Sequence, residues 1–417
     1  MTANLRPIAS LLLSVALLLA GNGLQFTLLP LRGQAEGFGT LALGIMASAY
    51  YVGFVSGCLL GPHAVARAGH IRAFAAMLAV AVASTLAYAL VPHPAAWIAL
   101  RLITGFALAG FYLVIESWLN DHAVNETRGF VMSTYVGINF AAIVVGQLLV
   151  PLYPIEQDGA FMLSAILCAL AIVPVAMTRS AQPAPITLVR FKPRQLYEAA
   201  PVALVASFMI GVANGAFWGL APISAAGSGL GTAGVAVFMS VTALAGALAQ
   251  WPAGRLSDRI DRRLVLLALL IGAAATGVAL WLIAATGLPM LAFGFLFGAL
   301  TLPTYSLAAA HAYDKTAAAD MVPTAATVLL ANSVGAAIGP LLATAAITPE
   351  GPRRLFLFIA ATQALLAAYV FYRTRVQAPP QPVDKTGFDL ATTAQVGTVV
   401  VTDAPVAPEH TAEPEPT

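Results

Sequence analysis

The stretch GRLSDRIDRR, residues 254–263, carries six charged side chains in ten residues, whereas only 9% of the 417-residue chain is charged. Apolar segments flank it, ending in LAQWPA and resuming with LVLLALLIG. Overall, 59% of the residues are hydrophobic and the mean hydropathy is +0.85. Soluble domains are about 25% charged, so this chain has too little polar surface to cover a water-soluble core. The composition therefore indicates a polytopic membrane protein.

Twelve apolar segments are long enough to cross a bilayer, because a spanning helix needs about 20 residues. They cover residues 8–31, 40–60, 70–91, 96–119, 129–151, 159–178, 200–224, 232–253, 263–285, 288–311, 321–346 and 353–373. These runs are continuous and lack the alternation that is typical of barrel strands. The predicted fold class is therefore an all-α integral membrane protein with twelve transmembrane helices.

The Lys and Arg residues are unevenly distributed between the two sets of loops. With twelve spans, both termini lie on the same side of the membrane. Sixteen of the twenty Lys and Arg residues fall in the loops and tails of that side, and four fall on the other. Because cytoplasmic loops are enriched in Lys and Arg, we expect a multi-pass protein of the cell inner (cytoplasmic) membrane with both termini in the cytoplasm.

The second half of the chain repeats the first. NGLQFTLLPL from Asn22 matches NGAFWGLAPI from Asn214 at an offset of 192, and after a one-residue slip the offset stays at 193, as for Tyr112 and Tyr305. A register that holds over six helices predicts two six-helix, pseudo-symmetric halves with a pathway between them. We therefore expect an N-terminal half, a cytoplasmic linker, a C-terminal half and a disordered acidic, Pro-rich tail at residues 1–178, 179–199, 200–373 and 374–417.

These features resemble the major facilitator superfamily over about residues 6–375. GRLSDRIDRR is similar to its signature G-x-L-x-D-R-x-G-R-R between the second and third helices of a half, with Asp261 in place of the second glycine. RLITG at 101–105 resembles the Arg-x-x-x-Gly motif of its fourth helix, whose arginine is associated with proton coupling in relatives. The Gly-Pro motif of drug exporters is absent, since Gln147 stands where that proline would be. GNGLQFTLLPLR and VIESWLND resemble a bacterial branch of carriers, which suggests a riboflavin-like vitamin as a candidate solute.

The resemblance implies a cytoplasmic gate built from Gly254, Asp258, Arg259, Arg262 and Arg263. In this gate Asp258 would face the positive N-terminal end of a helix in the other half, near Arg128. The matching N-terminal loop, GPHAVARAGHIR, has no acidic residue, so we expect a one-sided contact. Alternatively, the cluster only sets the topology, which would account for its arginines but not for its acids.

Ionisable residues inside the spans are few, and their cost within a bilayer makes them functional candidates. Arg101, Tyr112 and Glu116 share one face of the fourth helix. Because burial disfavours the charged form of a carboxyl group, Glu116 is the candidate proton-titrating residue. Arg101 is the second proton-coupling candidate. Alternatively, Glu116 extends to the cytoplasmic interface, and Arg101 is a structural anchor near the outer end.

The candidate substrate-binding residues are neutral amides and aromatics, several at matching places in the two halves. They are Asn22, Gln25, Phe26, Tyr112, Asn139, Asn214, Phe217, Trp218, Tyr305 and Asn332. Asn residues within membranes also join helices, so each is alternatively a structural contact. The set suits a neutral or weakly charged, polar, planar solute, whereas a dicarboxylate or a phosphate ester would need more Arg or Lys.

The features together predict a secondary active transporter of a small organic solute that works by alternating access and is proton-coupled, with uptake favoured. The alternatives are a drug or metabolite efflux antiporter and a transporter-like membrane sensor. The sequence contains no catalytic constellation, metal-ligand cluster or phosphate-binding glycine loop, so we expect no enzyme activity, no cofactor and no metal. We expect a monomer whose partners are its small-molecule substrate, protons and the lipid bilayer, without nucleic acid.

Overall fold

The computed structural model describes residues 8–122, 128–177, 191–282, 287–317, 320–348, 351–376 and 387–388, without the side chains of Asn120, His122 and Arg128. Twelve spans in these ranges are long and apolar enough to cross a membrane, as expected. The spanning helices are α1 (Ala9–Ala35), α2 (Thr40–Ala68), α3 (His70–Leu90), α4 (Pro94–His122), α5 (Arg128–Leu148), α6 (Gly159–Leu170) with α7 (Ile172–Ala176), α9 (Pro201–Gly227), α10 (Thr232–Arg259), α11 (Arg262–Leu282), α12 (Leu288–Thr301) with α13 (Pro303–Tyr313), α14 (Met321–Thr344) and α15 (Arg354–Val376). The predicted all-α membrane fold is therefore confirmed.

Two spans are each divided into two helices, and a glycine turns the chain between two others. The tenth span is interrupted at Leu302, and α13 begins at Pro303, which has no N–H group with which to continue α12. The sixth span is interrupted at Ala171, between α6 and α7. Gly69 has a φ angle of 82° and turns the chain directly from α2 into α3.

Glycines at matching positions let the helices of each half approach backbone to backbone. A Cβ at Gly105 of α4 would lie 2.0 Å from a backbone oxygen of α2, and one at Gly298 of α12 would lie 2.1 Å from a backbone oxygen of α10. Gly146 of α5 and Gly339 of α14 make the same kind of contact with α1 and α9, at 2.0 and 2.1 Å. Both glycine pairs are 193 residues apart, so the sequence repeat is also a repeat of helix packing.

The two halves share one hydrophobic core at one end of the molecule. There, near the connection between α1 and α2, Leu28 and Leu43 belong to the same buried cluster as Phe217 and Ala343 of the other half. The hydroxyl of Ser240 on α10 also donates to the backbone oxygen of Val144 on α5, over 3.3 Å. We call this the joined end of the molecule.

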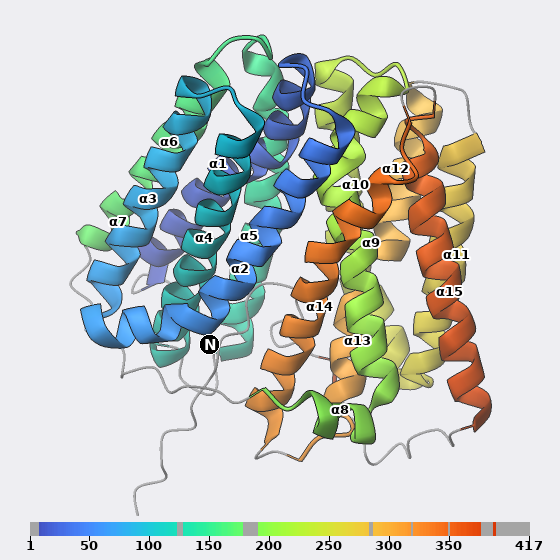
Figure 1. Cartoon of the computed structure of the whole chain (residues 1–417). Coiled ribbons are helices and arrows are strands. Elements are labelled where there is room, and N and C mark those ends of the chain that lie inside the picture. Colours follow the sequence, from blue (N-terminus) through green and yellow to red (C-terminus); the bar gives the residue numbers. More distant parts are fainter. Residues whose placement is uncertain are drawn as a thin grey trace, which may run out of the picture.

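At the opposite end each half has a core of its own. One cluster contains only residues of the N-terminal half, such as Val65 and Trp118. Another contains residues of the C-terminal half, such as Val370, together with Leu196 of the linker. Figure 1 shows the helices of the two halves approaching each other at the top and diverging toward the bottom, where α8 (Pro193–Ala199) lies. We call this the separated end.

Large apolar side chains cover much of the outer surface of the helices. Leu60, Leu90, Leu248 and Leu365 are examples that lie on different helices and are more than half exposed. A soluble monomer rarely exposes so many large apolar residues. This surface suits contact with lipid chains.

Part of the predicted linker is helical and is tied to the C-terminal half. The ammonium group of Lys192, just before α8, lies 2.8 Å from a carboxylate oxygen of Asp320, just before α14. Hydrogen bonds from Lys192 and Gln195 lower the pKa of the Asp320 carboxyl group. The predicted tail boundary at residue 374 is three residues too early, because α15 continues to Val376. The linker before residue 191, and the tail after Val376 apart from Gly387 and Phe388, lie outside the described residues, so disorder of that part of the tail stays a prediction.

Candidate substrate cavity and gate

A cavity lies between the two halves and contains about 1060 Å³ of space free of protein atoms, part of it continuous with solvent. Its walls come from α1, α2, α4 and α5 on one side and from α9, α10, α13 and α14 on the other. The described residues that line it are all uncharged: amides, hydroxyls, aromatic rings and aliphatic side chains. A solute in this cavity would therefore contact both halves at once.

Six of the ten predicted substrate-binding residues line this cavity: Asn22, Phe26, Tyr112, Asn139, Trp218 and Asn332. The Phe26 and Trp218 rings face each other across the two halves, with centroids 6.2 Å apart. The Nδ2 group of Asn139 donates to the backbone oxygen of Tyr135 over 2.6 Å. Its Oδ1 atom, and that of Asn332, have no hydrogen-bond partner among the described residues. Both halves thus contribute amide groups to the cavity wall.

Gln25 and Phe217 do not line this cavity, because they point into the interior of their own halves. The Nε2 group of Gln25 donates to the hydroxyls of Thr85 on α3 and Ser164 on α6, over 3.0 and 2.9 Å. Phe217 packs on the ring of Phe297, with centroids 5.4 Å apart. Successive residues of a helix are about 100° apart around its axis, so Trp218 faces the cavity while Phe217 faces the core.

Asn214 and Tyr305 are also absent from the cavity wall. Both amide atoms of Asn214 are buried and have no partner among the described residues. Tyr305 belongs to the core of the C-terminal half, and the next residue, Ser306, lines the cavity instead. Tyr112 and Tyr305 therefore match in sequence but differ in what their side chains contact, because Tyr112 lines the cavity and Tyr305 packs in a core.

Several wall residues were missed by sequence reasoning. Three of them form an aromatic group on α2, in the stretch YYVGF: Tyr50, Tyr51 and Phe54. Their clustering in one short segment was a usable signal. Gln250 on α10 is another, and its Oε1 atom accepts a hydrogen bond of 3.4 Å from the Ser306 hydroxyl. A lone amide within an apolar span could have indicated it. The remaining missed wall residues are Phe140, Ile143, Leu302, Ser306, Leu329 and Ser333.

Arg101 lies directly behind the aromatic wall of the cavity and is only 5% exposed. Its guanidinium carbon is 4.3 Å from the ring centroid of Tyr50 and 5.5 Å from that of Phe26, and both rings line the cavity. Such stacking stabilises a buried cation through the negative face of the ring. Arg101 therefore gives this side of an uncharged cavity a positive potential.

Glu116 is buried one helical turn from Tyr112 and does not line the cavity. It is 2% exposed, so it does not extend to the interface. The Tyr135 hydroxyl donates to Glu116 Oε1 over 3.1 Å, while the backbone oxygen of Tyr135 accepts the Asn139 amide. Asn139 belongs to the cavity wall, so one residue, Tyr135, contacts the buried carboxyl group through its hydroxyl and a wall residue through its backbone oxygen.

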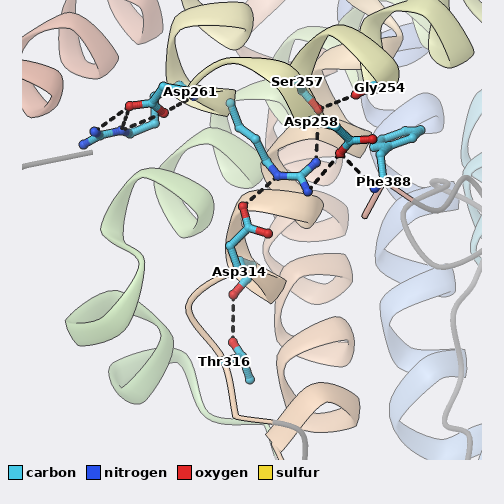
Figure 2. Close-up of polar contacts among 10 residues, drawn as sticks. Gly254, Ser257, Asp258, Asp261, Asp314, Thr316 and Phe388 are labelled. Carbon is cyan, nitrogen blue, oxygen red and sulfur yellow. Dashed lines mark hydrogen bonds and ion pairs between the residues drawn. The ribbon is translucent and has the colours of Figure 1, made fainter. Parts of the chain in front are cut away.

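The arginines of GRLSDRIDRR divide into exposed and buried residues. Arg259 is exposed, whereas Arg262 is 1% exposed and lies between two acids. Its Nε atom is 2.7 Å from Oδ2 of the fully buried Asp314, and its Nη2 atom is 3.3 Å from Oδ1 of Asp258 (Figure 2). Its Nη1 group also donates to the Ser257 hydroxyl over 3.0 Å. Arg262 therefore does more than set the topology, because it joins the end of α10 to the end of α13.

Arg263 is also buried and paired. Its Nη2 atom lies 2.7 Å from Oδ2 of Asp261. Partial burial opposes ionisation of the Asp261 carboxyl group, but side-chain and backbone hydrogen bonds from Arg263 outweigh it and lower the pKa of Asp261. The residue that departs from the family signature is thus the ion-pair partner of its last arginine.

Asp258 has two described contacts, and one of them comes from the C-terminal tail. Besides Arg262, its Oδ1 atom accepts a hydrogen bond of 2.9 Å from the backbone N–H of Phe388. The Phe388 ring lies against Gly254, four residues earlier on α10. The predicted partner region of Asp258 near Arg128 involves a side chain that lies outside the described residues. That contact therefore stays a prediction.

Twelve spanning helices in two repeated halves around a shared cavity are the architecture of a membrane transporter. The family model of the Major Facilitator Superfamily matches residues 11–322 and, again, residues 203–408. The chain belongs to this superfamily, and the predicted resemblance is confirmed.

Known relatives agree with this assignment. The chain is 26% identical over 387 residues to the uncharacterized MFS-type transporter YcaD of Escherichia fergusonii, which covers 91% of this chain and 99% of the relative. It is 28% identical over 366 residues to YcaD of Escherichia coli O7:K1, and this match covers 86% of this chain and 94% of the relative. The crystal structure of the nucleoside transporter NupG is similar, with a TM-score of 0.72, 14% identity and coverage of 87% and 98%. The crystal structure of a bacterial homologue of the human lysosomal transporter Spinster, in an inward-facing and unoccupied conformation, is similar as well. Its TM-score is 0.71 at 14% identity, and the match covers 93% of this chain and 99% of that chain.

Proposed function

We propose that the protein is a proton-coupled secondary active transporter that takes up a small, neutral or weakly charged polar solute across the cell inner membrane. The observation that carries this proposal is the cavity between the halves, whose described wall is uncharged and is built from both halves. A site shared by two packed bundles becomes accessible from alternate sides when one bundle rocks against the other.

The cavity wall supports a planar solute with several hydrogen-bonding groups. The rings of Phe26, Tyr112 and Trp218 offer apolar faces on which a flat solute can stack. The amides of Asn22, Asn139 and Asn332 can donate to and accept from its polar edge. Riboflavin-like vitamins have this combination of features. Nucleosides have it too, and they are carried by the similarly folded NupG.

The charge distribution supports an orientation in which the separated end faces the cytoplasm. Sixteen of the twenty Lys and Arg residues lie in loops and tails on the side of the termini, which is the side of α8. In this orientation the described conformation is open toward the cytoplasm, and the shared core at the joined end closes the pathway to the outside.

Glu116 is the group that we assign to proton coupling. Its carboxyl group is buried, is hydrogen-bonded to Tyr135, and is linked through Tyr135 to Asn139 in the cavity wall. Loss or gain of its proton would change the charge beside the wall by one unit. Arg101, behind the rings on the opposite part of α4, supplies the fixed positive charge.

Flux into proteoliposomes tests this proposal. Purified protein is reconstituted, a pH gradient is imposed, and uptake of radiolabelled riboflavin, uridine and a panel of other planar neutral solutes is measured against protein-free vesicles. We expect uptake of at least one planar solute that rises with an acidic outside and is abolished by a protonophore. Solute extrusion driven by the same gradient would indicate an efflux antiporter, and no gradient-dependent flux across the panel would contradict the transporter proposal.

A further inference from the structure

Phe388, twelve residues beyond the last residue of α15, lies on the gate segment at the separated end. The Arg262 guanidinium contacts both Asp314 and Asp258. Figure 2 shows Phe388 beside Asp258, on the side away from Asp314. The contact joins the tail to the one acidic residue that the signature assigns to gating.

The backbone N–H of Phe388 and the guanidinium of Arg262 share a single oxygen, Oδ1 of Asp258, at 2.9 and 3.3 Å. Hydrogen bonds to a charged acceptor are stronger than those between neutral groups. The Asp258 side chain is still 36% exposed with Phe388 in contact, so the tail covers this carboxylate only in part.

The Phe388 ring packs directly on Gly254, in space that any larger side chain at residue 254 would fill. The three atoms nearest to a Cβ at Gly254 all belong to this ring, at 2.1, 2.3 and 2.6 Å. Phe388 is half-buried and packs with Ala253 against the core of the C-terminal half. The contact therefore combines a charged hydrogen bond at Asp258 with apolar packing at Gly254, on one face of the end of α10.

We propose that the tail segment Gly387–Phe388 is an intramolecular ligand of the gate that holds the separated end apart and slows the transport cycle. If closure of this end requires Asp258 to face the other half, Phe388 obstructs it, because Phe388 occupies the side of Asp258 that lies away from Asp314. The tail must then leave before the end closes. This inference rests on the proposed alternating-access function. We call the slowing effect of Gly387–Phe388 the brake, and it acts outside the solute cavity.

The effect of the tail can be tested without any solute, by measuring the distance between the two halves at the separated end. Spin labels on cysteines replacing Ala66 of α2 and Ala326 of α14, with Cys58 and Cys168 changed to Ala, report this distance. Two truncations form the matched comparison. One removes residues 389–417 and keeps Phe388, and the other removes residues 377–417 and with them the whole contact.

We expect the shorter truncation to resemble the full chain. The longer truncation should raise the ratio of closed to open populations about tenfold, the size expected for loss of one hydrogen bond to a charged group. Phe388→Ala, which keeps the N–H group, should give a smaller shift in the same direction. Gly254→Ala should give a shift comparable to Phe388→Ala, because its methyl group displaces the ring.

Two results would overturn the brake. One is an unchanged distance distribution in the longer truncation, and the other is an equal shift in both truncations, which would assign the effect to residues after Phe388. Because the measurement needs no substrate, absence of transport for every solute tested would contradict the proposed function and leave the distance result standing.

Discussion

The hydroxyl of Tyr135 on α5 donates a hydrogen bond of 3.1 Å to Oε1 of Glu116 on α4, and both residues are buried in the N-terminal half. The carboxyl group has no equivalent in the other half, where Ala309 occupies the matching position 193 residues later. The two halves therefore share their packing but differ in charge. In the proposed mechanism, the N-terminal half would carry the proton while both halves contact the solute.

Glu116→Gln should abolish uptake driven by a pH gradient and leave exchange of solute across the membrane intact. The amide keeps the size of the side chain and its acceptor for Tyr135, but it cannot release a proton. Driven uptake and counterflow in proteoliposomes are the two measurements. Asp121→Asn, an exposed acid at the end of the same helix, is the control and should change neither. Unchanged driven uptake in Glu116→Gln would exclude this residue as the coupling group.

Asn139→Ala and Asn332→Ala should each raise the KM for the transported solute by about tenfold, the loss expected for one or two hydrogen bonds. Gln25→Ala should act differently, because Gln25 joins α1 to α3 and α6 and does not line the cavity. We expect it to lower thermal stability with little change in KM. Initial uptake rates and thermal unfolding of the detergent-purified protein separate the two effects. A KM change only in Gln25→Ala would reverse this assignment.

Arg262→Ala should destabilise the protein by about 3–5 kcal/mol, because it leaves the fully buried Asp314 carboxylate without its cation. Replacing both residues by apolar side chains, as in Arg262→Met with Asp314→Leu, should recover most of this loss, since no uncompensated charge remains. Thermal unfolding followed by size-exclusion fluorescence gives both values. A double variant as unstable as Arg262→Ala would show that the ion pair itself, rather than charge balance, is required.

Asp258→Asn should impair transport more than any single change in residues 61–72, because the N-terminal loop has no acid at the matching place. Asparagine keeps an acceptor oxygen but removes the charge that attracts a helix N-terminus. Arg67→Ala, in the matching loop, is the control variant. Transport rates are compared at equal amounts of protein in the membrane. Equal or milder impairment by Asp258→Asn would reduce the cluster to a topology signal.

The sequence by itself determined the number of spans, the helical class and the repeat. Each depends on local properties: the length of an apolar run, the absence of alternation, and residues such as Gly105 and Gly298 that recur at a constant offset. These properties act within one helix or one helix pair, so no knowledge of the whole fold is needed to recognise them. Asn22, Asn139 and Asn332, which the sequence offered as candidates for substrate binding, line the cavity, and their contact with a solute stays a prediction.

The tertiary structure decided which side of each helix faces the solute and which charges meet. Phe217 and Trp218 are neighbours in sequence, yet one packs in the core and the other lines the cavity. Tyr305, the residue that matches Tyr112, packs in the core of the C-terminal half, and its neighbour Ser306 lines the cavity. Arg262 pairs with Asp314 across 52 residues, and Phe388 contacts Asp258 across 130 residues. Helix rotation and long-range pairing are set by packing against other segments, and a local pattern of residues carries no information about those partners.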